Sequence, residues 1–236
     1  VGESTVEAAL RGGDSSHRIT MGATGAVTLT ALNDASWIAV AGAGAYGGKV
    51  GVGVAVAVQA HEAEVTAEAS HLVMASGKTL AGLAVSAQNR QDIHTVAAGA
   101  AVSRGAEGGA GVGMVAINVL EQSTNVLLSD ATLAVKSGGA VSLAAVNAVV
   151  LDAIAGGLAL TGGKAAVGVA VAVNVLRDKD GAGAGVTLTG SRLSTAGGGI
   201  AILAGDRATM VATAVGAAAA RSVGLAGSAA VNDAET

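Results

Sequence analysis

Residues 46–58 read YGGKVGVGVAVAV, and residues 161–173 read TGGKAAVGVAVAV, 115 positions further along the chain. From Val50 to Val58, valine alternates with glycine or alanine. A period of two residues is typical of a pleated strand with one branched face and one nearly bare face. A helix is disfavoured, because each interior glycine costs it about 1 kcal/mol. The stretch therefore predicts β-structure.

A longer repeat extends over the whole sequence. Asn33, Asn89, Asn147 and Asp206 each close an alternating apolar stretch, and they follow one another at steps of 56, 58 and 59 residues. A second series interleaves with the first at about half that distance: Gln59, Asn118, Asn174 and Asn232. The pattern predicts about four 58-residue repeats, each of two pseudo-equivalent halves, within one repeat domain over residues 1–236. The repeat boundaries fall near 1–33 (partial), 34–90, 91–148, 149–207 and 208–236 (partial).

Turn signals follow one another about every 15 residues. They lie at 47–49, 61–62, 76–78, 89–91, 105–109, 121–124, 137–139, 162–164, 178–185 and 197–199. Regularly spaced short strands favour an all-β fold, and a 58-residue unit without aromatic motifs favours a parallel β-helix, or β-solenoid, over a propeller or a sandwich. We expect short strands with inward Val, Leu and Ile, about eight coils of about 28 residues, and a ladder of stacked asparagines.

The two halves of a repeat differ in polarity. Residues 65–73 and 80–87 show one polar face, as expected for a sheet with one side in water. Residues 38–46 and 50–58 are apolar on both faces, and one of these faces is only glycine and alanine. A bare face lets another β-layer approach closely. We therefore expect a second layer or a neighbouring protein to cover these strands.

Composition excludes several classes of function. The 236 residues are 51% apolar and 13% charged, a balance opposite to that of disordered chains. With a net charge of −4 and 1% aromatic residues, the sequence lacks the basic surface and the stacking aromatic side chains that nucleic-acid binding requires. The absence of cysteine excludes disulfides and thiolate metal sites. The longest uncharged stretch, 137–151, is shorter than the roughly 20 residues that span a bilayer, so we expect no membrane-spanning segment.

No residue pattern points to catalysis or metal binding. The four histidines lack the spacing of metal ligands, and Asp14-Ser15-Ser16-His17 is interpreted as a turn, since adjacent residues do not converge as a hydrolytic triad. The segment 178–181 opens like a calcium loop but lacks the later ligands. Glycines 105–113 and Lys164 lack the serine or threonine of a phosphate loop. We thus expect no enzyme, no catalytic, cofactor or metal residues, and no cofactor.

The recurring GGKAAVGVAVAVN unit resembles the repeats of filamentous-haemagglutinin-like and leukotoxin-like adhesins, which are large secreted passengers of Gram-negative-type bacteria. The resemblance implies a β-helical stalk, export through an outer-membrane secretion barrel, and a location that is secreted or on the bacterial cell surface. It does not identify a host or neighbouring-cell receptor. Coils of 19 to 20 residues, common in that family, would give about twelve coils.

Function is thus expected to be a non-catalytic stalk or fibre segment. Both ends of the sequence stop within a repeat and without a polar cap, so we expect a fragment of a longer repetitive passenger that self-associates or stacks end to end. The longest candidate insertion is 177–185. Two alternatives remain open: a β-helical polysaccharide-active enzyme, which requires Asp130, Asp152, Glu121 and Arg177 to converge on one face, and a secreted leukotoxin-like toxin segment.

Overall fold

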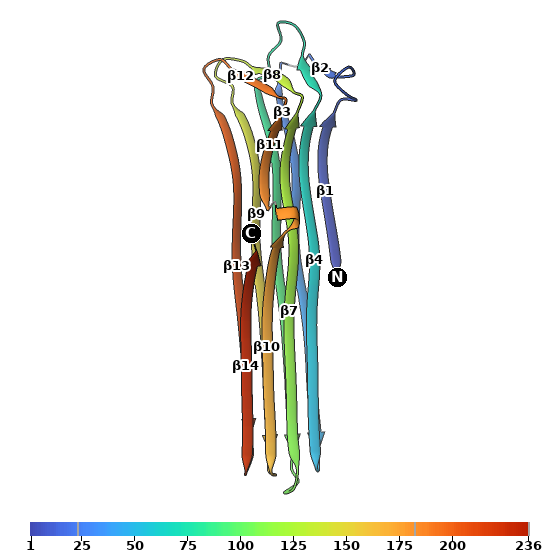
Figure 1. Ribbon diagram of the computed structural model, residues 1–236, viewed down its shortest axis with the longest axis vertical. Helices are drawn as coiled ribbons and strands as arrows, with labels where there is room; N and C mark the ends of the chain where they lie inside the picture. Colours follow the sequence, from blue (N-terminus) through green and yellow to red (C-terminus); the bar gives the residue numbers. More distant parts are fainter. Residues whose placement is uncertain (23, 182, 236) are drawn as a thin grey trace.

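The computed structural model describes residues 1–22, 24–181 and 183–235, and most of them lie in three parallel β-sheets (Figure 1). Sheet A contains β1 (Gly2–Arg11), β4 (Val50–Ser70), β7 (Gly109–Ser129), β10 (Ala165–Asp178), β11 (Ala184–Thr189) and β14 (Val223–Glu235). Sheet B contains β2 (Ile19–Met21), β5 (Leu72–Met74), β8 (Thr132–Val135) and β12 (Arg192–Thr195). Sheet C contains β3 (Ala26–Gly47), β6 (Gly82–Ser103), β9 (Val141–Thr161) and β13 (Ile200–Ala219).

The chain passes through sheets A, B and C in that order and then starts the next turn. Each strand pairs in parallel with the equivalent strand of the next turn; Val50 pairs with Gly109, for example, and Ala165 with Val223. The arrangement is consistent with a parallel β-solenoid, as the sequence predicts. One full turn of the solenoid contains one whole repeat of the sequence, since Asn33 pairs with Asn89 and Asn89 with Asn147.

The expectation of short strands and 28-residue coils is wrong. Strands β4 and β6 contain 21 and 22 residues. Three of the expected turns, at 61–62, 89–91 and 121–124, lie in the middle of β4, β6 and β7. Their polar residues do not reverse the chain, because the polar side chains around them find hydrogen-bond partners between the sheets, as described below. The half-period in the sequence thus reflects that each turn of the solenoid contains two similar long strands, one in sheet A and one facing it in sheet C.

The strands run along the longest axis of the molecule, and successive turns lie side by side across it (Figure 1). At one end tight turns connect sheet C to sheet A; at the other end sheet B connects sheet A to sheet C. We call residues 38–60, 94–119, 152–175 and 211–232 the stem. The part around β2, β5, β8 and β12 is the head. At about 3.3 Å per residue, β4 alone extends about 70 Å.

The core of the head is built from large aliphatic side chains. Leu72, Leu80, Leu133 and Leu143 are buried there, together with inward valines such as Val65. These residues fill the space between sheets A, B and C. The expected inward Val, Leu and Ile are therefore found in the head.

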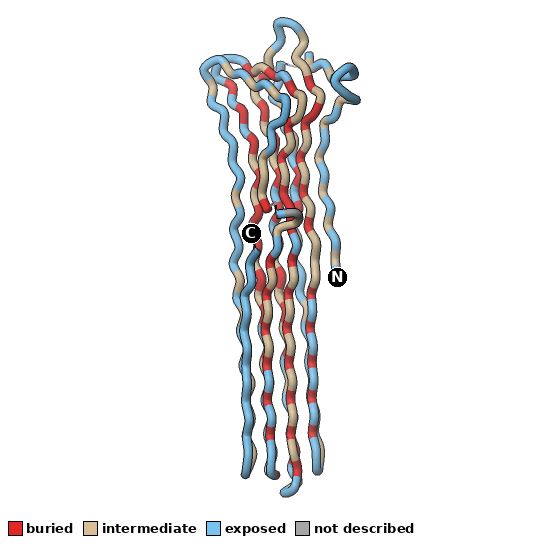
Figure 2. Tube along the Cα trace, viewed as in Figure 1, coloured by how far each residue is buried: buried red, intermediate tan, exposed pale blue. Residues whose placement is uncertain are grey.

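In the stem the pattern is reversed, and the expectation of inward valine is wrong. Along β4, Val50, Val52, Val54, Val56 and Val58 point to solvent, while the glycines and alanines between them are buried (Figure 2). The inward alanines of sheets A and C form one cluster. The expected second layer over the bare face is thus the facing sheet of the same chain.

Inward glycines bring the two sheets of the stem into close contact. A Cβ atom added to Gly168 of β10 would lie 2.3 Å from the carbonyl oxygen of Ala217 in β13. One added to Gly99 of β6 in sheet C would lie 2.3 Å from Cε of Met114 in β7 of sheet A. Such close contact leaves little room for large side chains, which explains why most branched residues of the stem lie on its outer faces, with Val112 and Met114 as large inward exceptions.

Left-handed backbone conformations recur at the corners of the head. Gly77, Gly138 and Gly197 have φ of 70°, 76° and 81°, and each lies in an expected turn between sheets B and C. At the corner from sheet A to sheet B, His71, Asp130 and Gly190 have φ between 48° and 58°. Successive turns of the chain therefore bend in the same way. In the described part of the chain, no helix has the length and apolar character needed to cross a membrane.

Candidate interaction surfaces

Two tiers of buried polar side chains separate the stem from the head. The stem-side tier consists of Gln59, Thr95, Asn118 and Asn174, and the head-side tier consists of Asn33, Asn89, Gln91, Gln122, Thr124 and Asn147. An apolar cluster around Ile93, Leu120 and Leu151 lies between them. The two asparagine series of the sequence are therefore one series on each of two facing sheets.

In the stem-side tier Asn118 and Asn174 each bond both to the asparagine of the next turn and to the facing sheet. Asn118 donates from Nδ2 to Oδ1 of Asn174 at 2.9 Å and to the backbone oxygen of Asp152 in sheet C at 2.8 Å. Its Oδ1 accepts from the hydroxyl of Thr95. Asn174 repeats the pattern toward Asn232, at 2.9 Å, and toward the backbone oxygen of Val211, at 2.7 Å. The expected asparagine ladder is present, and it ties sheet A to sheet C.

The head-side tier contains two bonded pairs of the first series. Asn33 donates to Oδ1 of Asn89 at 3.0 Å, and Asn147 donates to a carboxylate oxygen of Asp206. The hydroxyl of Thr124 in sheet A donates to Oδ1 of Asn147 in sheet C. A shift of one residue in either sheet would break these bonds, so the tiers fix the register of successive turns.

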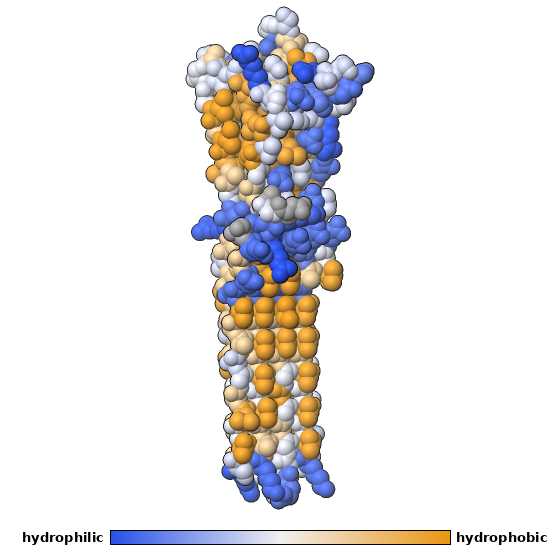
Figure 3. Space-filling model, in the orientation of Figure 1, coloured by the Kyte–Doolittle hydropathy of each residue, from blue (hydrophilic) through white to orange (hydrophobic). Residues whose placement is uncertain are grey.

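The outer surface of sheet A in the stem is apolar over its whole height (Figure 3). We call it the valine face: Val50, Val52, Val54, Val56 and Val58 of β4; Gly109, Gly111, Gly113, Val115, Ile117 and Val119 of β7; Ala165, Val167, Val169, Val171, Val173 and Val175 of β10; and Val223, Leu225, Gly227, Ala229 and Val231 of β14. Val52 is 63% exposed and Leu225 60%. Apolar surface of this extent marks an interaction site.

Charged residues border the valine face toward the head. We call this group the collar: Glu3, Glu62, Glu64, Glu121, Asp233, Glu235, Arg177 and Lys179. Lys179 bonds to the carboxylates of both Glu62 and Glu64, two strands away in sheet A. The bond to Glu62, followed by that to Glu64, raises the pKa of Lys179 above its usual range, so this lysine stays charged. Six acids against two bases leave the collar negative.

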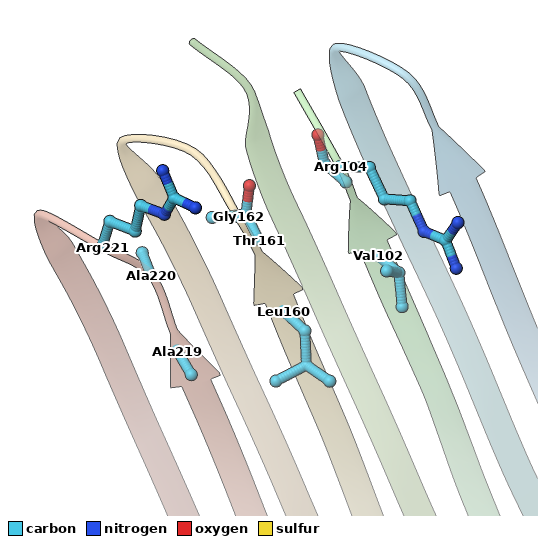
Figure 4. A pocket seen from close by; sticks show the side chains of 9 residues that line it. Val102, Arg104, Leu160, Thr161, Gly162, Ala219, Ala220 and Arg221 are labelled. Atoms are coloured by element: carbon cyan, nitrogen blue, oxygen red, sulfur yellow. The ribbon is translucent and has the colours of Figure 1, made fainter. Parts of the chain in front are cut away.

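The opposite border of the valine face is the tip, where the tight turns of the stem place Lys49, Arg104, Glu107, Lys164 and Arg221. Lys164 pairs with Glu107, and the guanidinium of Arg104 lies 5.5 Å from the centre of the Tyr46 ring. A shallow hollow of about 580 Å³ lies beside these turns, lined by residues that include Arg104, Leu160 and Arg221 (Figure 4). With four bases and one acid, the tip is positive.

The outer surface of sheet C in the stem, which we call the second face, is also apolar. It includes Ile38, Val40, Ile154, Leu158 and Val215. At the collar level, Nδ1 of His94 lies 3.3 Å from a carboxylate oxygen of Asp152. On the neighbouring edge, the ring of Trp37 stacks on His61 with centroids 4.5 Å apart, and burial lowers the pKa of that histidine.

The four histidines are dispersed, as the sequence indicates. His17 lies in the turn after β1, His71 at a corner of the head, His61 in β4 and His94 in β6. In the part of the chain that the structure describes, no group of three histidine, aspartate or glutamate residues could hold a metal ion. Asp14 accepts from the backbone of Ser16 and His17 at 2.7 and 2.8 Å, so the expected turn is present. Contrary to the expectation that these adjacent residues do not converge, the exposed turn places Nδ1 of His17 at 2.9 Å from Oδ1 of Asp14 and at 3.1 Å from Oγ of Ser16. The hydroxyl of Ser16 contributes most to lowering the pKa of Asp14 to about 2.

The charged residues named for an enzymatic groove do not share one face. Glu121 and Arg177 are register partners on sheet A, whereas Asp152 lies on sheet C and Asp130 at the corner after β7. The candidate insertion does interrupt the fold. Asp178 pairs with Gln122 and Ala184 with Thr124, and Lys179–Gly181, which follow Asp178, form the 3₁₀ helix η1 outside the sheet.

Sequence reasoning missed the valine face, the collar and the tip as distinct surfaces. The signal was present, since valine alternates with glycine or alanine, without any polar residue, from Val50 to Val58. Which of the two faces points outward depends on the distance between the sheets, which no local pattern contains. Comparison with protein-family models, curated protein sequences and solved structures finds no match.

Proposed function

We propose that this chain is a non-catalytic structural segment of a bacterial cell-surface adhesin filament. In this proposal the structural unit is the 58-residue repeat of two facing halves, present in about four copies. The filament grows along the direction in which successive turns stack, by continuation of a longer chain or by end-to-end association. The resemblance of the GGKAAVGVAVAVN unit to adhesin passengers supports the cell-surface setting.

One observation carries the structural role: like residues lie above like residues in register from turn to turn. Asn118, Asn174 and Asn232 bond in a continuous series, and the four long strands of sheet C stay paired over their whole length. Such stacking provides length and stiffness. Binding and catalytic sites, in contrast, usually lie on loops that break regularity; within the described residues the segment around η1 and the loop at residues 12–18 do so, and both lie outside the long strands.

The test is electron microscopy of cells that express the full parent protein, labelled with an antibody raised against this chain. Labelled thin filaments that are lost when the gene is disrupted support the proposal. Two measurements separate the alternatives. Release of reducing sugars from bacterial or host polysaccharides by the purified chain would favour an enzyme, and dye leakage from vesicles would favour a toxin segment.

A further inference from the structure

The valine face has the dimensions of a protein–protein interface. Each strand contributes about nine to eleven residues, so the face is about 30 Å high along the strands. The four strands β4, β7, β10 and β14 lie side by side at about 4.8 Å per strand, so the face is about 19 Å wide. Pairing two such faces removes roughly 1,200 Å² of surface from water, the lower limit for a stable interface. A second copy of this chain is thus large enough to cover the face.

Side-chain size changes along β7, one of the two central strands of the face. Its glycines 109, 111 and 113 lie toward the tip, and Ile117 and Val119 lie toward the collar. When a second copy lies end for end against the first, the glycines of β7 in one copy oppose the large residues of β7 in the other.

Charge points to the same orientation. The tip carries four bases and one acid, whereas the collar carries six acids and two bases. In an end-for-end pair the tip of each copy meets the collar of the other. In a pair with the same orientation, collar would meet collar and tip would meet tip, which like charges oppose.

We propose that the valine face binds the valine face of a second copy, end for end, about a two-fold axis near Val56. Along β4, Val56 lies seven residues from Lys49 at the tip and six residues from Glu62 in the collar, so rotation about it brings Lys49 of one copy beside Glu62 of the other. The inference rests on the proposed function and adds the lateral contact through which two filament segments adhere.

Sedimentation equilibrium of the purified chain tests the pairing. Val169 on the valine face and Ile154 on the second face are each 42% exposed, which makes Val169→Lys and Ile154→Lys matched variants. We expect the wild type and Ile154→Lys to sediment at twice the chain mass of 22.1 kDa, and Val169→Lys to bind its partner about 100-fold more weakly. Equal thermal midpoints of the two variants establish that both are folded.

Crosslinking tests the orientation, since the chain has no cysteine. Under mild oxidation Val56→Cys should form a covalent dimer and Val50→Cys should not, because only Val56 lies near the proposed axis. Glu62→Lys and Lys49→Glu should each weaken pairing about tenfold, and the double variant should restore it.

Four results would overturn the inference and leave the filament proposal standing: a wild-type monomer at 100 μM, equal loss of pairing in Ile154→Lys, crosslinking of Val50→Cys instead of Val56→Cys, or flotation with phosphatidylcholine vesicles that Val169→Lys abolishes. Lateral dimers without any labelled filament on cells would contradict the proposed function alone.

Discussion

Asn118 and Asn174, which lie one turn of the chain apart, are joined by a hydrogen bond of 2.9 Å between their side chains. Both are fully buried between sheets A and C. The bond belongs to a network that also reaches the backbone of the facing sheet. The same residues therefore set the register between successive turns of the chain and hold sheets A and C together.

Replacement of Asn118 should destabilise the whole chain. Asn118→Ala leaves the backbone oxygen of Asp152 and Oδ1 of Asn174 without this donor and the hydroxyl of Thr95 without its acceptor. We expect a loss of about 3 kcal/mol in the free energy of unfolding, measured by chemical denaturation. The control is Asn232→Ala at the exposed end of the same ladder, with an expected loss under about 1 kcal/mol. Equal losses would contradict a buried structural network.

Because the two sheets of the stem approach closely, we predict that the loss of stability from a glycine-to-alanine substitution depends on whether the glycine faces inward or outward. In Gly168→Ala the new methyl group collides with the backbone oxygen of Ala217, and we expect a loss of about 2 kcal/mol or more. Gly156 on the outer face of β9 has open space at its Cβ position, so Gly156→Ala should change stability by less than about 0.5 kcal/mol. The reverse order of the two unfolding free energies would show that alanine and glycine do not face inward.

The carboxyl group of Asp178 predicts a pH dependence of stability. Burial, followed by repulsion from Asp206, raises its pKa above the usual 3.8. A group whose pKa is raised by folding binds its proton more tightly in the folded state, so the folded state loses stability as the pH rises through this range. Asp178→Asn should therefore unfold at a higher temperature than the wild type at pH 7, and at nearly the same temperature at pH 3. A lower midpoint at pH 7 would contradict this assignment.

The sequence predicts a parallel β-solenoid correctly, but it does not predict how many residues each turn of the solenoid contains. The alternation in residues 50–58 and the recurring asparagines are local signals, and each corresponds to a strand or a ladder in the structure. Residues His61, Arg90 and Glu121 suggest turns because polar groups usually break apolar strands. Here the polar tiers supply partners within the strands, and no sequence pattern states that the partners come from a facing sheet.

The orientation of the stem strands could not be predicted for a related reason. Valine usually points inward because burying it removes apolar surface from water. In the stem the gain comes from the close contact of two bare faces, such as Gly168 against Ala217, and the valines remain outside for another partner. That choice depends on the packing of residues 49 positions apart in the sequence.

Cryo-electron microscopy of antibody-labelled filaments from the cell surface would show directly how the turns of the chain stack. We expect ribbons with strands perpendicular to the filament axis, a spacing of about 4.8 Å along that axis and a width of at least about 70 Å. Compact soluble particles in place of ribbons, or filaments whose strands run along the axis, would contradict this expectation.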